Sequence, residues 1–536
     1  MMRTRLTSLG VLVVLVATAC GGSNNTTSSS SSSGSAGKPD LTAILRYQGV
    51  VGPSQDPIKV GQTCEPLTLH AIYDGLFDYD ANNVLVPELA TGYQLMSGNV
   101  LRLSLRKGVN FQDNTPFNAD AVVFNLTRVM TDPASTIKGM LADVQSVSAV
   151  DDATVDITMK RAAIGTVLPN LADRAGLMAS PTAVKNAGSE AAFAQHPVGA
   201  GMYAVSGTIV SRQSMSVRRW NGYWDKSVQL LGGIDFSEIP FTSLDNAIKA
   251  GDVDWVSPQS VADGDALKGA SGVKLFEGPG TQFRLLVMNE TMAPFNNDQL
   301  RQAVSYAIDR PALAKALTEG QAKATWQEFP PSSPAYDPNL DKNPPFPHDT
   351  AKAKQLLQTA GFPNGFSFDA YVGSSATSFV QMGELMAAQL AQVGITMNVK
   401  TVDIATAFPT IYLAGATKHG TAQAASYGGV ASPDPDSQFH AHYLSDGTTN
   451  AGGNDAPGLR GLITQAESTA DQSQRYALYR QANDLVINEV QDGVPLFYDP
   501  AITAIRNYVG GVSRAVQYCS ASFRGVFINQ GKAPIG

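Results

Sequence analysis

Apolar and polar residues alternate strictly in two short segments of the chain. Residues 101–105 (LRLSL) and 155–159 (VDITM) place an apolar side chain at every second position and a polar one between. Because successive side chains of a strand point to opposite faces, this pattern buries one face and leaves the other in water. We therefore predict a half-buried strand in each segment.

A helical period replaces this alternation in the second half of the chain. Residues 353–360 place apolar side chains at i, i+3, i+4 and i+7. Asp349 or Thr350 precedes this stripe as the expected N-cap, and Gly361 follows it at the kind of position where helices commonly end. The pattern predicts a helix that begins near residue 350 and stops at the glycine.

The helical period returns at residues 382–393, where the predicted buried stripe includes Leu385 and Gly394 ends the helix. Residues 395–399 then alternate again, so a strand is expected directly after that helix. Further on, Asp471 begins an Asp-x-x-Gln capping box before another apolar stripe. Strands and helices therefore alternate along the chain, which is typical of the α/β class, and no short internal repeat is present.

The first twenty residues have the features of an export signal. Arg3 and Arg5 precede an uncharged apolar run, residues 9–17, which is followed by small residues and Cys20. This run is too short to span roughly 30 Å of hydrocarbon, so residues 1–19 are expected to be a cleaved lipoprotein signal peptide. Cys20 would then be the first mature residue and carry the lipid anchor. An ordinary secretory signal that ends near a cysteine is the alternative.

Small polar residues dominate the segment that follows the signal. Residues 20–39 contain Cys20 and then mainly Ser, Thr, Asn and Gly, including consecutive serines at 28–33. This composition buries too little apolar surface to fold, so we interpret the segment as a lipidated cysteine with a flexible Ser-rich tether. The folded body is expected to be extracytoplasmic, lipid-anchored to the bacterial cell membrane.

The composition of the body restricts its partners. Apolar residues make up 43% of the chain and charged residues 16%, as in a soluble globular protein with two or three hydrophobic cores. The net charge of −8 becomes −10 once Arg3 and Arg5 are removed with the signal. No Lys/Arg cluster is present, which argues against nucleic acid as a partner. No later apolar stretch approaches the roughly 18 residues of a membrane span.

Several longer segments match the pattern of one known family, in the same order along the chain. They are residues 72–77 (IYDGLF), 86–90 (VPELA), 105–111 (LRKGVNF), 115–122 (TPFNADAV), 196–203 (HPVGAGMY), 220–224 (WNGYW) and 301–310 (RQAVSYAIDR). In this pattern the chain resembles the extracytoplasmic solute-binding proteins of ABC importers, the group that includes oligopeptide-, dipeptide- and nickel-binding proteins (bacterial solute-binding protein family 5). One departure is Asn114, where the family usually has Gly.

Two of these segments also have a simple physical interpretation. Asp309 is placed to cap a new helix just before Pro311, where a proline in the first turn loses no intrahelical hydrogen bond. Gly199 and Gly201 are expected to form a tight turn before a strand that starts near Met202. The local pattern therefore agrees with the family resemblance.

The resemblance implies an α/β fold of two lobes, periplasmic-binding-protein-like, with a hinge and an interlobe ligand cleft. One discontinuous lobe would be built from residues 40–282 and 502–536, and the other from 283–501. The chain would cross between them near residues 283–289 and 494–499. A solute that contacts both lobes favours the closed state, which a membrane permease would then recognise.

Two cysteines remain once Cys20 is assigned to the lipid. Cys64 and Cys519 form an even pair in an oxidising compartment, which is compatible with a disulfide between the beginning and the end of the body. Two buried free thiols are the alternative. Both cysteines would fall in the same lobe of the implied architecture, which favours the disulfide.

The resemblance also implies which residues line the cleft. The expected ligand-binding residues are Tyr47, Gln48, Trp326, Tyr427, Asp434, Asp436 and Phe439. Peptide binders of the family pair the peptide's α-ammonium group with an aspartate shortly before an Asp-Pro turn. Here Val430 and Ala431 occupy the corresponding positions, so Asp434 or Asp436 would have to substitute, because a buried ammonium needs a partner. Otherwise the solute lacks a free amine, as a modified peptide, a glycan or a metal chelate does.

Other kinds of site find little support in the sequence. No His-Glu-x-x-His, Gly-x-Ser-x-Gly or Walker motif occurs, so neither an enzymatic activity nor a cofactor is expected. His440 and His442 would share a face and ligate a metal only if they lay on a strand, and a solvated pair without metal is the preferred interpretation. Residues 434–436 (DPD) lack the spacing of a calcium loop and are interpreted as a turn.

Three functions are compatible with these features, in decreasing order of support. The first is a substrate-binding subunit that captures di- or oligopeptides and delivers them to an ABC permease with cytoplasmic ATPase subunits. The second is the same role for a non-peptide solute. The third is a tethered enzyme or a structural surface protein, which the missing catalytic motif disfavours.

Replacing Cys20 with Ala is expected to release the protein from membranes into the medium, because no thioether to the lipid can form and the serine tether has no affinity for the bilayer. Fractionation and mass spectrometry of the mature N-terminus measure this. Membrane retention of the variant, together with an N-terminus of the natural protein that carries no acyl mass, would show that the anchor is absent.

Overall fold

The computed structural model describes most of the body of the protein. The described residues are 37–60, 66–81, 83–96, 99–258, 261–374, 377–403, 421–430, 434–447, 449–453, 455–491, 493–512 and 522–535. Residues Gly37–Ile535 form one compact unit. The predicted signal, Cys20, Cys64 and Cys519 lie outside the described residues, so the lipid anchor and the disulfide stay predictions.

The largest sheet of the described residues has ten strands, in the order β14-β13-β15-β12-β16-β11-β1-β10-β9-β8. Its strands are β1 (Ile44–Gln48), β8 (Tyr203–Val205), β9 (Ser214–Arg219), β10 (Gly233–Ser237), β11 (Trp255–Val256), β12 (Val273–Met288), β13 (Ser367–Gly373), β14 (Thr396–Val402), β15 (Ala424–Val430) and β16 (Gly493–Arg506). The sheet is mixed, because β1 is parallel to β10 and β13 is parallel to β14 and β15, whereas β12 is antiparallel to both of its neighbours.

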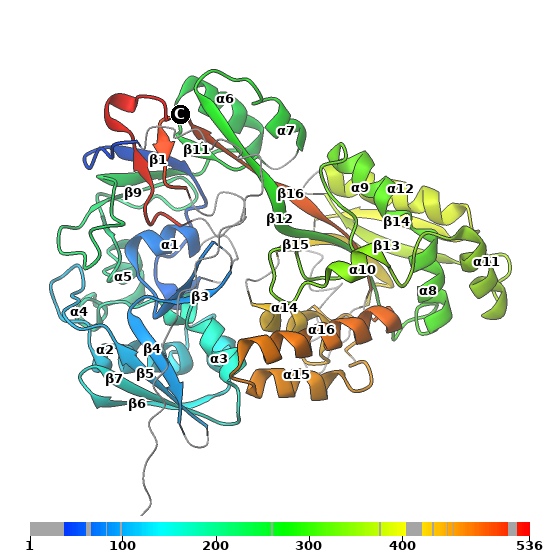
Figure 1. Cartoon of the computed structure of the whole chain (residues 1–536), viewed down its shortest axis with the longest axis horizontal. Helices are drawn as coiled ribbons and strands as arrows, with labels where there is room; N and C mark the ends of the chain where they lie inside the picture. Colours follow the sequence, from blue (N-terminus) through cyan, green and yellow to red (C-terminus); the bar gives the residue numbers. More distant parts are fainter. Residues whose placement is uncertain are drawn as a thin grey trace, which may run out of the picture. The chain divides into compact units, whose positions relative to one another are not determined.

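Two long strands connect the two ends of this sheet. β12 and β16 pair antiparallel from Val273 opposite Arg506 to Val287 opposite Gly493, and they lie side by side in Figure 1. On their outer edges β16 pairs with β11, and β12 pairs with β15. The crossings predicted near residues 283–289 and 494–499 therefore coincide with this ribbon, while the lobe boundaries themselves stay a prediction.

A second sheet in the described part of the chain has four antiparallel strands, in the order β4-β5-β7-β6. They are β4 (Ala90–Leu95), β5 (Val100–Leu105), β6 (Val144–Asp151) and β7 (Thr154–Met159). The predicted strands at 101–105 and 155–159 are confirmed as β5 and β7, with their leucine, valine, isoleucine and methionine side chains buried. Two small ladders join β2 (Phe77–Tyr79) to β3 (Leu85–Pro87) and β17 (Val509–Gly510) to β18 (Phe527–Ile528).

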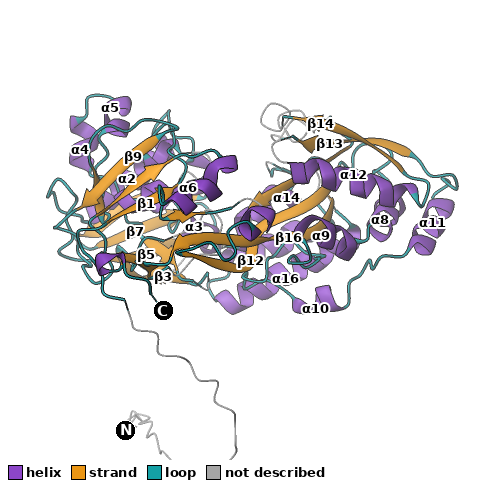
Figure 2. Ribbon diagram, turned by 90° about the horizontal axis from the view of Figure 1, so that it is seen from above, coloured by secondary structure: helices purple, strands orange, loops and turns teal. Residues whose placement is uncertain are grey.

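Helices cover these sheets. In the first half they are α1 (Pro66–Ile72), α2 (Ala119–Thr131), α3 (Ile164–Asn170), α4 (Pro181–Asn186), α5 (Glu190–Gln195), α6 (Leu244–Ala250) and α7 (Val261–Asp265). In the second half they are α8 (Asp298–Ala307), α9 (Arg310–Thr318), α10 (Pro338–Lys342), α11 (Thr350–Thr359), α12 (Thr377–Ala391), α14 (Pro435–Tyr443), α15 (Leu459–Ser468) and α16 (Gln472–Glu489). Figure 2 shows α12 beside β13 and β14, with which it shares a core.

The predicted helix ends are confirmed. The side chain of Asp309 accepts a hydrogen bond from the Ala312 N–H, that of Asp349 from the Lys352 N–H, and that of Asp471 from the Gln474 N–H. Each bond satisfies one of the backbone donors that the first turn of a helix leaves unpaired. Asp349 rather than Thr350 is therefore the cap of α11. Gly361 and Gly394 follow α11 and α12 with φ of 86° and 90°, the left-handed region that glycine tolerates best.

Two local predictions are wrong. Leu385 is 37% exposed, because the stripe that faces the sheet runs through Met382, Met386 and Leu390 and is too narrow to include it. Residues 434–436 are not a turn but the start of α14, with Asp434 as its N-cap and Pro435 and Asp436 as its first two residues. The chain bends at residues 200–202 before β8, as expected, but neither Gly199 nor Gly201 has a positive φ, so the backbone conformation there does not require glycine.

The two glycines at 199 and 201 allow close backbone contact instead. A Cβ at Gly199 would lie 2.3 Å from the Ile72 carbonyl oxygen, and one at Gly201 would lie 2.5 Å from the Ile72 carbonyl carbon. The side chain of Gln112 closes the same junction by donating to the Ile72, Gly201 and Tyr203 carbonyls. Any side chain at these positions would push apart α1 and the segment before β8.

The position where the chain departs from the family pattern is also explained. Asn114 has a φ of 64°, a conformation that glycine adopts freely and that asparagine tolerates better than most residues. The substitution therefore preserves the turn. Among the residues that the structure describes, no helix has the length and apolar character needed to cross a membrane.

The contact at residue 72 leads to a stability prediction. Gly201→Ala is expected to destabilise the fold by about 1–3 kcal/mol, because the new methyl group overlaps the backbone of Ile72. Gly461→Ala in α15 is the matched control, since nothing lies within 4 Å of its Cβ position, and a helical Gly→Ala change stabilises by roughly 0.5–1 kcal/mol. Urea unfolding of both variants measures the difference. Equal stabilities would contradict the proposed close contact.

Candidate functional site

The residues predicted to bind ligand fall into separate groups. Tyr47 and Gln48 are the last two residues of β1. The Tyr47 ring meets the rings of Trp255 and Phe523 edge-on at 5.3 and 5.2 Å. Tyr47 is 3% exposed and Gln48 is 8% exposed. Among the residues that the structure describes, the Tyr47 ring thus packs with Trp255 and Phe523 in an aromatic core at the end of β1.

Trp326 lies in the segment between α9 and α10. Its indole N–H donates to the Phe346 carbonyl at 3.0 Å, and the Arg310 guanidinium lies 5.2 Å from its ring. The Arg310 guanidinium in turn donates to the Pro495 carbonyl of β16. Trp326 is thus fixed by its neighbours, and these contacts tie the loop to the central ribbon.

Tyr427 lies on β15, opposite Leu285 of β12. Its side chain is outside the part that the structure describes, as is the whole of Ala431. Val430 is the last residue of β15. Val430 is one of the two positions where the resemblance implies an ammonium-binding aspartate. It therefore lies on a strand next to the β12–β16 ribbon.

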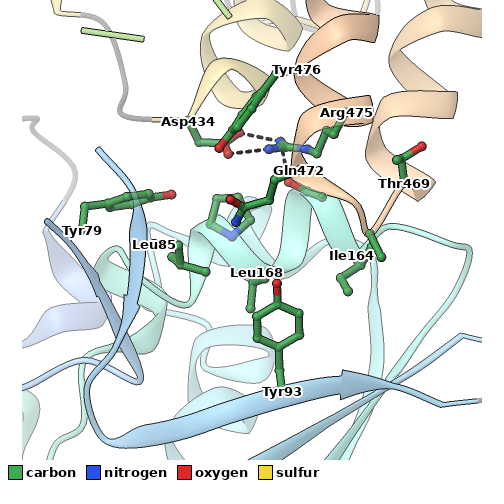
Figure 3. A pocket seen from close by; sticks show the side chains of 13 residues that line it. Tyr79, Leu85, Tyr93, Ile164, Leu168, Asp434, Thr469, Gln472, Arg475 and Tyr476 are labelled. Carbon is green, nitrogen blue, oxygen red and sulfur yellow. Dashed lines mark hydrogen bonds and ion pairs between the residues drawn. The ribbon is translucent and has the colours of Figure 1, made fainter. Parts of the chain in front are cut away.

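Asp434 is already held by a buried arginine. It caps α14 by accepting a hydrogen bond from the Asp436 N–H at 3.0 Å. Its two carboxylate oxygens also accept hydrogen bonds of 2.6 Å from Arg475 of α16, as Figure 3 shows. The Arg475 guanidinium donates further to the Gly165 carbonyl of α3 at 2.7 Å. Asp434 therefore joins α14 to α16, and a cation already compensates its charge.

A small pocket lies beside this ion pair. Its walls come from β2 to β4, from α3 and from the start of α16, and Tyr79, Tyr93 and Tyr476 are among the lining side chains (Figure 3). The space open to water inside it is about 20 Å³, and a buried water needs about 10–15 Å³. In this conformation the pocket has room for water but not for a peptide.

Asp436 has a less complete set of partners than Asp434. Its carboxylate accepts a hydrogen bond from the Tyr479 hydroxyl. Burial raises the pKa of Asp436 to about 6, Glu467 adds to this effect, and Arg475 opposes it. A carboxyl group with a raised pKa is one whose negative charge is not fully compensated. Asp436 is therefore the better placed of the two carboxylates to gain from an incoming cation.

Phe439 is a core residue. It is fully buried on α14, stacked on Phe329 at 5.4 Å and packed on Tyr443 at 4.7 Å. Asp434, Asp436 and Phe439 thus share one helix. Within the described part of the chain, no hydrogen bond, ion pair or ring contact joins them to Gln48 or Trp326.

The paired histidines do not form the arrangement that a metal would need. His440 and His442 lie on α14 rather than on a strand, so their side chains do not share a face. The Nδ1 of His442 lies 2.6 Å from a Glu328 carboxylate oxygen. His440 lies near Glu467 and Asp446, and its hydrogen bond with Glu467 raises the pKa of its imidazole.

Two residues of β12, Phe283 and Arg284, were not identified from the sequence. The Phe283 ring lies 5.5 Å from the His442 ring and 6.2 Å from the Tyr498 ring. On the next residue of β12, Arg284 forms a 2.6 Å ion pair with Asp499 of β16. The only sequence signal for this pair was an arginine within an apolar segment at a predicted chain crossing.

Comparison with known proteins identifies the family. The family model "Bacterial extracellular solute-binding proteins, family 5 Middle" matches residues 84–450. The glutathione-binding protein GsiB of Shigella flexneri is 30% identical over 467 residues, which cover 84% of this chain and 87% of that protein.

Solved structures share the fold. The periplasmic binding protein DppA from Helicobacter pylori, in complex with the peptide STSA, superimposes with a TM-score of 0.76 at 23% identity and covers 92% of this chain and 99% of its own. AgaA from A. tumefaciens R10, in complex with agropinic acid, gives a TM-score of 0.74 at 21% identity and covers 91% and 99%. The resemblance and the two-lobed α/β fold class predicted from the sequence are confirmed. The chain therefore belongs to family 5 of the bacterial extracellular solute-binding proteins, the binding components of ABC importers.

Proposed function

We propose that this protein captures small peptides or peptide-like solutes and delivers them to an ABC permease with cytoplasmic ATPase subunits. The observation that carries the proposal is the similarity to GsiB, which extends over 84% of the chain. GsiB is a glutathione-binding protein, and glutathione is a tripeptide. The peptide held by DppA, a protein of the same fold, supports the same class of solute. The protein acts outside the cytoplasm, anchored through Cys20.

The proposed site is a cleft between two lobes that meet along the β12–β16 ribbon. Gln48 and Tyr427 line it, Asp436 holds the ammonium group of the solute, and Tyr47, Trp326 and Phe439 support the walls from behind. Asp436 is preferred over Asp434, because Arg475 occupies both oxygens of Asp434, whereas the raised pKa of Asp436 indicates an uncompensated charge.

A second candidate function is the same importer role for a solute without a free amine, such as a modified peptide, a glycan or a metal chelate. One observation favours it: neither Val430 nor Ala431 supplies the carboxylate that free peptides need at this place. The agropinic acid bound by AgaA is an example of another solute held by the same fold.

Calorimetry with free and N-acetylated trialanine distinguishes the two functions. Asp436→Asn is expected to weaken free trialanine roughly 10- to 150-fold, because a charge-assisted hydrogen bond contributes about 1.5–3 kcal/mol. Acetylation should produce a similar loss in the natural protein and little further loss in the variant. Tyr479→Phe is the control, since it removes the hydroxyl that contacts Asp436 but no charge. Equal binding of both peptides would favour the amine-free solute.

The affinity for free trialanine is also expected to depend on pH. Burial raises the pKa of Asp436 to about 6, so the group is ionised at pH 7 and mostly protonated at pH 5. Only the ionised form attracts an ammonium group, and affinity should therefore fall as the pH is lowered through 6. N-acetylated trialanine and the Asp436→Asn variant serve as controls, and both should show a flat profile from pH 7 to 5. A parallel decline in all three would assign the effect to another group.

A further inference from the structure

One buried cation beside the ribbon has an unused donor. Arg284 of β12 is 7% exposed, and its Nη2 pairs with Asp499 of β16 at 2.6 Å. Its Nη1 is buried and has no hydrogen-bond partner among the residues that the structure describes. Buried guanidinium groups normally satisfy their donors, because an unpaired N–H away from water is unfavourable. The free Nη1 therefore points to an acceptor other than the residues that the structure describes.

A second buried arginine in the same half of the chain has a hydrogen-bond partner for each of its three guanidinium nitrogens. Arg301 of α8 is buried to a similar extent, at 4% exposed. Its Nε, Nη1 and Nη2 donate to the carbonyls of Val490, Phe295 and Glu489. Arg301 thus uses both of its terminal nitrogens within the chain, whereas Arg284 uses only Nη2 among the described residues.

The surroundings of Arg284 favour an anion. The guanidinium lies 4.0 Å from the ring of Phe379, in the first turn of α12. This helix is 15 residues long and has no acidic residue in its first turn, so the positive end of its dipole is not neutralised from within. The backbone approaches closely at Gly428 of β15, where a Cβ would lie 3.0 Å from Nη1. No β15 side chain competes for the donor at that position.

The position of Arg284 in the sheet is one where solutes commonly bind. β13 and β15 are parallel, and they end at Gly373 and Val430 on the same edge. Arg284 lies opposite Gly428, close to that edge, and α12 begins shortly after β13 ends. Ligands of α/β sheets bind beyond the carboxyl ends of parallel strands, where helix N-termini converge.

We propose that Arg284, together with the first turn of α12, binds a carboxylate of the imported solute. The inference rests on the proposed function, which it makes more specific: the solute is an organic acid as well as an amine or amide. Glutathione, a peptide with a free C-terminus and agropinic acid all meet this requirement, whereas a neutral glycan does not. Asp499 positions the guanidinium and limits its net charge.

Two variants of the Arg284–Asp499 ion pair are expected to change the affinity for carboxylates in opposite directions. Asp499→Asn keeps Arg284 but removes the competing negative charge, so binding of carboxylates should become tighter. The double variant with Arg284→Gln and Asp499→Asn keeps the site neutral and similar in size, and its affinity for glutathione or trialanine should fall about 10- to 150-fold. The C-terminal amide of each peptide should bind the natural protein and the double variant alike. Thermal unfolding monitors the fold of each variant.

Acetate provides a second readout that does not depend on the peptide. Sodium acetate should raise the melting temperature of the natural protein and of Asp499→Asn more than sodium chloride at equal ionic strength, and the double variant should not distinguish the two salts. If this difference is seen but no peptide binds, the carboxylate subsite stands and the proposed peptide function fails. If free acids and amides lose affinity equally in the double variant, or acetate acts like chloride in all proteins, the proposal is wrong.

Discussion

The antiparallel pairing of β12 with β16 holds the two ends of the large sheet together. Both strands run through that sheet, and each pairs on its outer edge with strands from a different part of the chain. Their ladder is irregular between Pro279 and Phe283 and between Arg284 and Leu285. Such irregularities bend and twist a strand locally and redirect its side chains. The unusual contacts of Phe283 and Arg284 occur at these points.

Buried charges are the second feature that organises the molecule. Asp434 and Arg475 are both nearly inaccessible, and their ion pair reaches the Gly165 carbonyl of α3. Arg161, which precedes α3 and has a half-exposed side chain, pairs with the buried Glu467 of α15 at 2.5 Å. Buried ion pairs contribute little net stability compared with apolar packing, but removing one partner is costly. These pairs therefore determine how α3, α14, α15 and α16 are placed against one another, and they contribute little to the net stability of the fold.

Local structure was largely predictable from the sequence, because it depends on neighbouring residues. The caps at Asp309, Asp349 and Asp471 and the strands at 101–105 and 155–159 follow from spacing alone. Contacts between distant residues were not predictable in this way. Nothing near Asp434 in the sequence indicates Arg475, and nothing near Arg284 indicates Asp499, since both pairs arise only when separate elements pack together.

The candidate site was predicted less well for the same reason. Family motifs indicated which segments to consider, but an aromatic residue such as Phe439 fits both a cleft and a core. Only its contacts with Phe329 and Tyr443 show that it is packed. The start of α14 was missed because Asp-Pro is common in turns as well as at helix N-termini. Asp434 was expected to be available for a solute, and only the tertiary structure reveals that Arg475 already holds it.

The proposed function requires that this chain holds a small peptide-like solute between its lobes, and the carboxylate subsite requires that the solute is an acid. Native mass spectrometry of the protein purified from its own cells can detect such a solute, because a molecule retained in the cleft adds its mass to the intact protein and is released on denaturation. We expect an adduct whose fragments contain a carboxylic acid and an amide bond. An adduct that is a neutral glycan would contradict both proposals. A protein that carries no solute and gains none from peptides added in excess would contradict the proposed function.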